Sequence, residues 1–414
     1  MRRIISSLDI GTNSIKLVVG EFQKDKLNIL SCVNVPSQGI KNGYIVNRES
    51  AEFALQEAFF KSEEILGMQI KETLVNVPSY GLSCFISNGS VNINNADKSI
   101  NHKHLIKAMQ NSVYGKIDNN KELVSIMPAK FFLNDDKQVS SPINMVANKL
   151  TVSDVAVVIP KKNVENIVNC IEKLNIKVTD VCINPLCDFY EFKTDDMKKV
   201  VGVIVNIGHT KTEVSIFNKG ILTASEIIDI GAINIDNDLA YIFKISKDTA
   251  KDIKEKLVVG DIKRASPSEF IIVTDSNEED IKITGYDASA IAISRINEIL
   301  NLVKKQISLL TKKEISYIIV TGGISKLKGF NTLLTNCLGN LAKVGMVEEI
   351  GARYNKYSVA VGMLKYYNSR LNLRNVNFSI FSEDEEDEFG GKNKRINVSD
   401  SSLLGKVFGY FFDN

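Results

Sequence analysis

The most constraining feature of this sequence is a hairpin pattern that occurs twice. Residues 8–19, LDIGTNSIKLVV, and residues 205–216, VNIGHTKTEVSI, each contain an apolar run, a short polar turn with a glycine, and an alternating run. This pattern predicts a strand, a tight turn and a second strand. Each copy opens a half of the chain that continues with further helix and strand patterns. The sequence therefore predicts an α/β chain built from two similar halves.

The turns of these hairpins suit phosphate binding. A tight glycine turn exposes backbone N–H groups that can cradle phosphate oxygens. Asp9 at the end of the first strand could hold Mg²⁺ through water, and Lys16 could return its ammonium to the phosphates. A plain surface hairpin would look similar. A third turn, VTGGIS at 320–325, follows a buried strand and opens a helix, which is a favourable place for a nucleotide.

The remaining pattern indicates insertions into this duplicated frame. A helix begins near Asn47 or Ser50, each of which can cap it. Residues 84–158 change to short strands around one helix, which is typical of an inserted subdomain. A strand is predicted over 177–186 and a long helix over 287–311.

Composition excludes several classes of protein. A length of 414 residues, with 44% hydrophobic and 24% charged residues, is typical of a globular protein with two or more domains. The net charge of +2 does not indicate a nucleic-acid partner. The six cysteines form no CxxC motif, and His102 and His104 have no ligand partners at metal-site spacing, so no metal centre is expected from them. No run of about 18 apolar residues is present, so we expect a cytoplasmic protein.

The C-terminal end has a separate pattern. The segment SEDEEDEFGGKNKR at 382–395 reads as a disordered linker. The last residues, SSLLGKVFGYFFDN, form an amphipathic helix when placed on a helical wheel, but so short a helix needs a surface to fold on. A membrane interface is the preferred surface, and a groove on a partner protein is the alternative. The apolar face consists of Leu403, Leu404, Val407, Phe408, Phe411 and Phe412.

These motifs together resemble the actin-like ATPase superfamily, in which the two hairpins and VTGGISKLKG correspond to two phosphate motifs and an adenosine motif. Within the superfamily the chain is most similar to the FtsA family of bacterial cell-division proteins. The similarity covers the whole chain, including the insert at 84–158 and the amphipathic tail. It implies an α/β, actin-like two-lobed fold of duplicated mixed sheets with a nucleotide cleft between the lobes. It further implies subdomain 1A at 1–83 and 159–197, 1C inserted at 84–158, 2A at 198–228 and 300–372, 2B at 229–299, a linker at 373–398 and a membrane-targeting helix at 399–414.

The resemblance also implies a function. ATP and Mg²⁺ would bind in the cleft, FtsZ would bind subdomain 2B through its C-terminal peptide, and the protein would polymerise and help to recruit later division proteins. Its location would be the cytoplasmic face of the membrane at the division septum. By resemblance, the nucleotide site would comprise Asp9, Gly11, Thr12, Asn13, Lys16, Asn206, Gly208, His209, Thr210, Lys211, Thr212, Lys254, Glu255, Gly322, Gly323 and Ile324, with Lys254 near the adenine.

The second phosphate motif departs from the usual Asp-x-Gly-Gly-Gly-Thr. Asn206 replaces the aspartate, His209 and Thr210 replace two glycines, and Lys211 stands at the threonine. An asparagine keeps an acceptor oxygen but attracts a cation less, and the lost glycines would limit how closely the loop approaches phosphate. ATP hydrolysis is therefore expected to be weak or absent. The alternatives are an FtsA-like pilus-assembly protein and a phosphotransferase of the sugar-kinase type.

Overall fold

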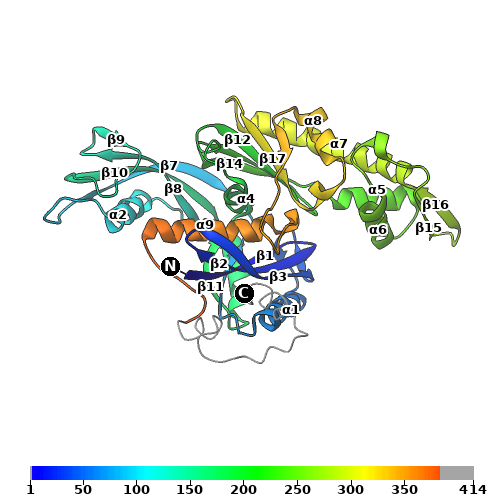
Figure 1. The fold of residues 1–414 in the computed structure, drawn as a ribbon, viewed down its shortest axis with the longest axis horizontal. Helices are drawn as coiled ribbons and strands as arrows, with labels where there is room; N and C mark the ends of the chain where they lie inside the picture. The colour runs from blue at the N-terminus through cyan, green and yellow to red at the C-terminus, as the bar shows by residue number, and fades with distance from the viewer. Residues whose placement is uncertain (1, 383–414) are drawn as a thin grey trace, which may run out of the picture.

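The structure, a computed structural model, describes residues 2–382, and the predicted amphipathic tail lies outside them. Its frame is a pair of five-stranded mixed sheets with the same strand arrangement (Figure 1). The first has the order β11-β6-β1-β2-β3 and the second β14-β13-β12-β17-β18. In each, the first strand of a hairpin pairs antiparallel with the second and parallel with a later strand. This arrangement confirms the two similar halves that the repeated hairpin predicts and the duplicated mixed sheets that the resemblance implies.

The strands of the first sheet are β1 (Arg2–Ile10), β2 (Ser14–Gln23), β3 (Lys26–Pro36), β6 (Glu72–Asn76) and β11 (Lys177–Cys182). Those of the second are β12 (Val201–Ile207), β13 (Thr212–Asn218), β14 (Ile221–Ile228), β17 (Tyr317–Thr321) and β18 (Ala342–Val344). The helices that pack on these sheets are α1 (Arg48–Leu66), α3 (Lys161–Glu172), α4 (Asn184–Phe192), α7 (Gly285–Leu310), α8 (Phe330–Leu338) and α9 (Ser358–Arg374).

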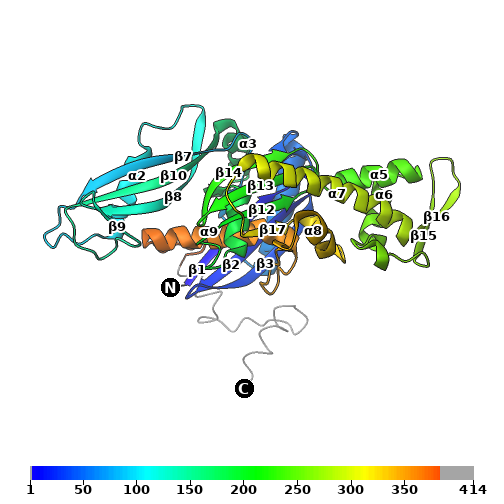
Figure 2. The ribbon, with the colours of Figure 1, turned by 90° about the horizontal axis from the view of Figure 1, so that it is seen from above.

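Two insertions extend from opposite ends of the long axis (Figures 1 and 2). One lies between β6 and α3 and has its own small core. The other lies between β14 and α7. The first contains β7 (Ser83–Asn92), α2 (His102–Val113), β8 (Lys121–Leu133), β9 (Lys137–Val139) and β10 (Lys149–Pro160), and the second contains α5 (Ile233–Phe243), α6 (Lys247–Leu257), β15 (Phe270–Thr274) and β16 (Asp280–Thr284).

The structure differs from the predicted strand at 177–186. The strand β11 ends at Cys182, and α4 begins at Asn184 with Pro185 in its first turn. Proline cannot donate a ladder hydrogen bond but suits the first turn of a helix, so it ends the strand and starts the helix. The helix α4 is buried along most of its length and lies between the two lobes, in contact with α9, β12 and β14.

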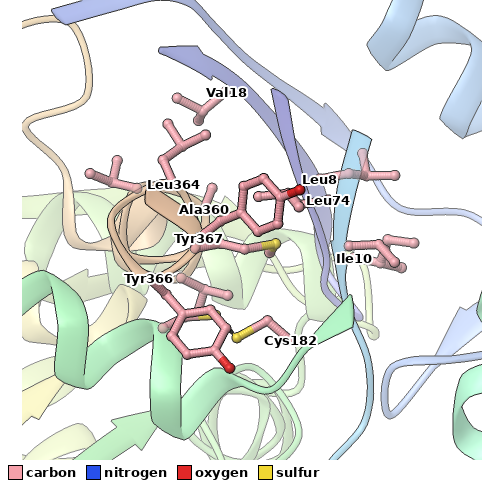
Figure 3. Packing of buried hydrophobic residues seen from close by; sticks show 14 of the residues in the cluster. Leu8, Ile10, Val18, Leu74, Cys182, Ala360, Leu364, Tyr366 and Tyr367 are labelled. Atoms are coloured by element: carbon pink, nitrogen blue, oxygen red, sulfur yellow. Dashed lines mark hydrogen bonds between the residues drawn. The ribbon is translucent and has the colours of Figure 1, made fainter. Parts of the chain in front are cut away.

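The C-terminal helix α9 also lies differently from its predicted place. The range 300–372 assigns it to the second lobe, whereas it packs against β1, β2 and β6 of the first (Figure 3). Leu364, Ala360 and Tyr367 of α9 face Leu8 and Leu74 there. The predicted linker starts at 373. Ile380 and Phe381 lie beyond that point and are buried against the first lobe.

The two histidines of the HKH sequence have structural contacts. His104 closes a capping box with Asn101 at the start of α2. The Nδ1 of His102 lies 2.8 Å from the carbonyl oxygen of Leu373 at the end of α9. The His102 contact attaches the insertion to the body of the first lobe.

Candidate functional site

A cleft of about 690 Å³ lies where the turns of the two hairpins face each other. Both lobes contribute to its walls, including the turn after β17 and the stretch of α6 from Lys251 to Glu255. All the predicted nucleotide-site residues line this cleft except Thr212. Thr212 is fully buried, and its hydroxyl donates a 2.8 Å hydrogen bond to the carbonyl oxygen of Ile230. A volume of this size is typical of sites that bind small molecules and cofactors.

The first hairpin places a carboxylate and an ammonium on neighbouring strands. Asp9 ends β1 directly opposite Lys16 on β2, and the Lys16 Nζ lies 3.1 Å from the Asp9 Oδ2. The Asn76 Nδ2 donates a 2.8 Å hydrogen bond to the other carboxylate oxygen. Asn76 stands at the end of the adjacent parallel strand β6. The charge at Asp9 is therefore held by one cation and one amide at the mouth of the turn.

The second hairpin forms the same turn without the usual glycines. The Gly208 N–H donates to the Lys211 carbonyl oxygen at 2.9 Å, as Gly11 does to Ser14 at 3.2 Å in the first hairpin. Neither His209 nor Thr210 has a positive φ, so the backbone conformation does not require glycine at either position.

Side chains of the second turn point into the cleft and across it. The Thr210 hydroxyl donates a 2.8 Å hydrogen bond to Asn42 of the first lobe. Burial, with the nearby charges of Lys254 and Lys251, lowers the pKa of His209 to about 4, so its imidazole is neutral at pH 7. Burial also lowers the pKa of Lys211. The Lys211 Nζ lies 4.6 Å from the centroid of the Tyr80 ring, in cation–π range.

The third turn depends on glycine. Gly322 has φ 102°, and a Cβ there would overlap the carbonyl oxygen of Ile207. A Cβ on Gly323 would meet no atom within 4 Å, so this side of the turn is open. The absence of side chains lets the β17 turn pass close behind the second hairpin, which brings the predicted adenosine motif to the phosphate motifs.

The positive charge of the cleft is in excess. Six lysines line it against the three carboxylates of Asp9, Asp252 and Glu255. Three of these lysines were not predicted from the sequence, although Lys251 precedes Lys254 by one turn of α6 and shares its face. The lining lysines are Lys16, Lys211, Lys251, Lys254, Lys326 and Lys356. A bound polyanion would neutralise this excess.

Two of the predicted site residues are held by other side chains. The Lys254 Nζ lies 2.6 Å from the Asp236 Oδ1, and both side chains are almost fully buried. Glu255 pairs more loosely with Lys326, at 3.5 Å. Lys254 therefore lines the cleft as half of an ion pair.

The residues that line the cleft fit a Mg²⁺–nucleotide only if waters and phosphates supply most of the ligands of the ion. Within residues 2–382, no group of three or more His, Cys, Asp or Glu side chains is arranged to hold a metal ion. Magnesium often keeps several waters and binds through one or two carboxylates plus substrate phosphates. Asp9 at the mouth of the first turn is compatible with that mode.

Comparison with known proteins gives the family. A profile described as "Cell division protein FtsA" matches residues 203–362, and one described as "SHS2 domain inserted in FTSA" matches residues 81–159. The two together cover more than half of the chain. Cell division protein FtsA of Bacillus subtilis is 27% identical over 382 residues, which span 91% of this chain and 87% of that protein. FtsA of Pseudomonas aeruginosa is 24% identical over 373 residues, spanning 88% and 89%.

Solved structures give the same fold at low identity. MreB5 of Spiroplasma citri bound to ADP has a TM-score of 0.58 and 13% identity over 90% of this chain and 99% of that one. The PilM-PilN type IV pilus biogenesis complex has a TM-score of 0.57 and 14% identity over 87% and 98%. These likenesses confirm the two-lobed actin-like architecture. The chain belongs to the FtsA family of cell-division proteins.

Proposed function

We propose that the protein binds ATP with Mg²⁺ in the interlobe cleft and uses this binding in the assembly of the division machinery. The observation that carries the proposal is the convergence of three turns and six lysines from both lobes on one cleft. Backbone N–H groups of the two hairpin turns would face the phosphates, and Gly322 and Gly323 would admit the nucleoside. The bound ion would shield phosphate charge, with Asp9 holding its water shell.

Turnover of ATP should be slow. The second hairpin supplies an uncharged amide at Asn206, and the His209 imidazole beside it is neutral. Neither group can match the attraction of a carboxylate for a hydrated cation. Binding without rapid hydrolysis would suit a protein whose nucleotide controls self-assembly.

The cellular role that we propose is a link between FtsZ filaments and the membrane. None of the helices in residues 2–382 is long and apolar enough to cross a bilayer. Attachment would instead use the apolar face of the tail, with attraction to anionic lipid from Lys392, Lys394 and Arg395. Self-assembly through the actin-like body would gather many weak tails at one surface. FtsZ would bind the second insertion through its C-terminal peptide.

Isothermal titration calorimetry with ATP and Mg²⁺ tests the cleft. Lys16→Ala removes the cation opposite Asp9 and should weaken binding about tenfold, which is a loss of about 1.4 kcal/mol. Lys137→Ala is the matched control, because Lys137 is an exposed lysine on β9, in the insertion between β6 and α3 and outside the cleft. Absence of ATP binding by the unmodified protein would remove the basis for the proposal.

Co-sedimentation with liposomes and FtsZ, with and without ATP, tests the membrane role. Phe408→Glu places a charge on the apolar face of the tail and should release the protein from vesicles while ATP binding persists. Tyr410→Glu adds the same charge on the opposite face and should have a much smaller effect. Equal pelleting of the Phe408→Glu and unmodified proteins would instead favour a partner groove for the tail.

A further inference from the structure

The unusual asparagine of the second hairpin has a buried carboxylate as its partner. The Nδ2 of Asn206 donates a 2.6 Å hydrogen bond to the Oδ2 of Asp188 on α4. The other oxygen of Asp188 accepts a 2.7 Å hydrogen bond from the Ser358 hydroxyl at the start of α9. Asp188 is only 1% exposed, and its carboxyl group contacts the cleft through Asn206 and Ser358, which both line it.

The first lobe contains the same pair with the charge exchanged. There the carboxylate is on the hairpin strand, at Asp9, and the amide is at Asn76, which ends the adjacent strand β6. The Asn76 Nδ2 lies 2.8 Å from the Asp9 Oδ1. In the second lobe the amide is on the strand and the carboxylate is behind it. Both lobes therefore have one carboxylate and one amide at the end of the central strand.

The residues opposite Asp9 and Asn206 on the neighbouring strands explain why a carboxylate is unfavourable at position 206. Asp9 lies opposite Lys16 on β2, but Asn206 lies opposite Glu213 on β13. Glu213 is 3% exposed. An aspartate at 206 would meet the carboxylate of Asp188 at hydrogen-bond distance and that of Glu213 across the ladder. Buried like charges at such distances repel strongly.

The pair also fixes which end of the amide faces the cleft. Both oxygens of Asp188 accept hydrogen bonds, one from the Asn206 amide and one from the Ser358 hydroxyl, so the NH₂ end of Asn206 faces Asp188. Within the described part of the chain, the Asn206 Oδ1 receives no hydrogen bond. Asn206 lines the cleft, so this oxygen is available to accept a hydrogen bond there.

We propose that Asp188 is the positioning residue of the second hairpin, and that Asp188 and Asn206 are a carboxylate–amide pair exchanged relative to Asp9 and Asn76. Asp188 holds the Asn206 amide with its oxygen toward the nucleotide cleft and places a carboxyl group directly behind the end of the strand. The role toward nucleotide rests on the proposed function, whereas the pairing itself does not.

A reversal of mutational effects tests the pairing in nucleotide-free protein. Asn206→Asp alone places two carboxyl groups together and should lower the melting temperature by about 3–6 °C. Asp188→Asn alone should lower it by less, because two amides can still share a hydrogen bond. In the Asn206→Asp background, however, Asp188→Asn should raise the melting temperature, because it restores one carboxylate and one amide. A double variant no more stable than the less stable single variant overturns the proposal.

Calorimetry with ATP and Mg²⁺ tests the positioning role in the same four proteins. Asp188→Asn should weaken ATP binding about tenfold in the original background, because the Asn206 amide is then free to turn. In the Asn206→Asp background it should strengthen binding. Equal effects in both backgrounds would contradict positioning. If none of the four proteins bound ATP, the proposed function would fail while the reversal in melting temperature would still decide the pairing.

Discussion

Replacing Lys254 by alanine should destabilise the second lobe as well as alter the cleft. The Lys254 Nζ lies 2.6 Å from the Asp236 Oδ1, with side-chain exposures of 12% and 4%. Removing one member of such a buried pair typically costs about 3–5 kcal/mol, because the other charge stays buried and unpaired. Asp236 can limit this cost by taking up a proton, since burial already raises its pKa despite Lys254. We therefore expect a loss of about 3 kcal/mol and a fall in melting temperature of about 3–4 °C for a chain of 414 residues.

The effect should depend on pH with a definite sign. The pKa of Asp236 in the folded protein lies above its ordinary value, so its charge opposes folding as the pH rises past that value. In acid the carboxyl is protonated in both the folded and unfolded states, and the penalty disappears. Thermal unfolding followed by circular dichroism should show a larger effect of Lys254→Ala at pH 8 than at pH 4.

Two variants control this experiment. Lys254→Ala with Asp236→Asn removes both charges and should regain most of the lost stability. Lys256→Ala lies on the same helix but breaks an exposed pair with Asp252, of 3.4 Å and with side-chain exposures of 64% and 69%, so it should change the melting temperature little. If Lys254→Ala and the unmodified protein had the same melting temperature at both pH values, the ion pair would not contribute to stability as argued.

Two further substitutions test the packing of the first lobe and its insertion. Gly362→Ala on α9 would push a Cβ into the carbonyl oxygen of Cys187 on α4, so we expect a loss of about 3 kcal/mol in urea unfolding, and an unchanged midpoint would contradict the close approach. Asp154 on β10 is fully buried, and burial raises its pKa to about 6. Because that value exceeds the ordinary one, Asp154→Asn should stabilise the protein by about 2–3 kcal/mol at pH 8 and not at pH 4, and equal effects at both pH values would be inconsistent with this reasoning.

The sequence by itself determined the duplicated frame. Two hairpins with the same alternation and the same glycine position specify two like sheets, because alternation sets which face of a strand is buried. Local signals also placed α1, whose cap at Asn47 accepts a hydrogen bond from the Ser50 N–H at 3.1 Å. The three turns also carried the resemblance that implied a nucleotide cleft between the lobes.

The sequence could not identify the partners within that cleft. It predicted Lys254 beside an adenine but not its ion pair with Asp236, and it placed Thr212 in a site that its side chain does not reach. Antiparallel pairing turns Thr212 toward the interior, where its hydroxyl donates a hydrogen bond to the carbonyl oxygen of Ile230 in the loop after β14. The orientation of a single side chain at a strand start depends on this register and not on the residue type.

Only the tertiary structure shows which side chain Asn206 pairs with. The helix α4 reads as NPLCDFYEF, a short segment buried along most of its length, and Asp188 is one of its buried residues. Its Asp188 lies 18 positions before Asn206 and looks unrelated to the hairpin in the printed sequence. Packing of α4 between the lobes brings its carboxylate behind the strand end. The carboxyl group missing from the second motif thus lies behind it in space, where hydrogen-bond geometry rather than sequence position sets which residues act together.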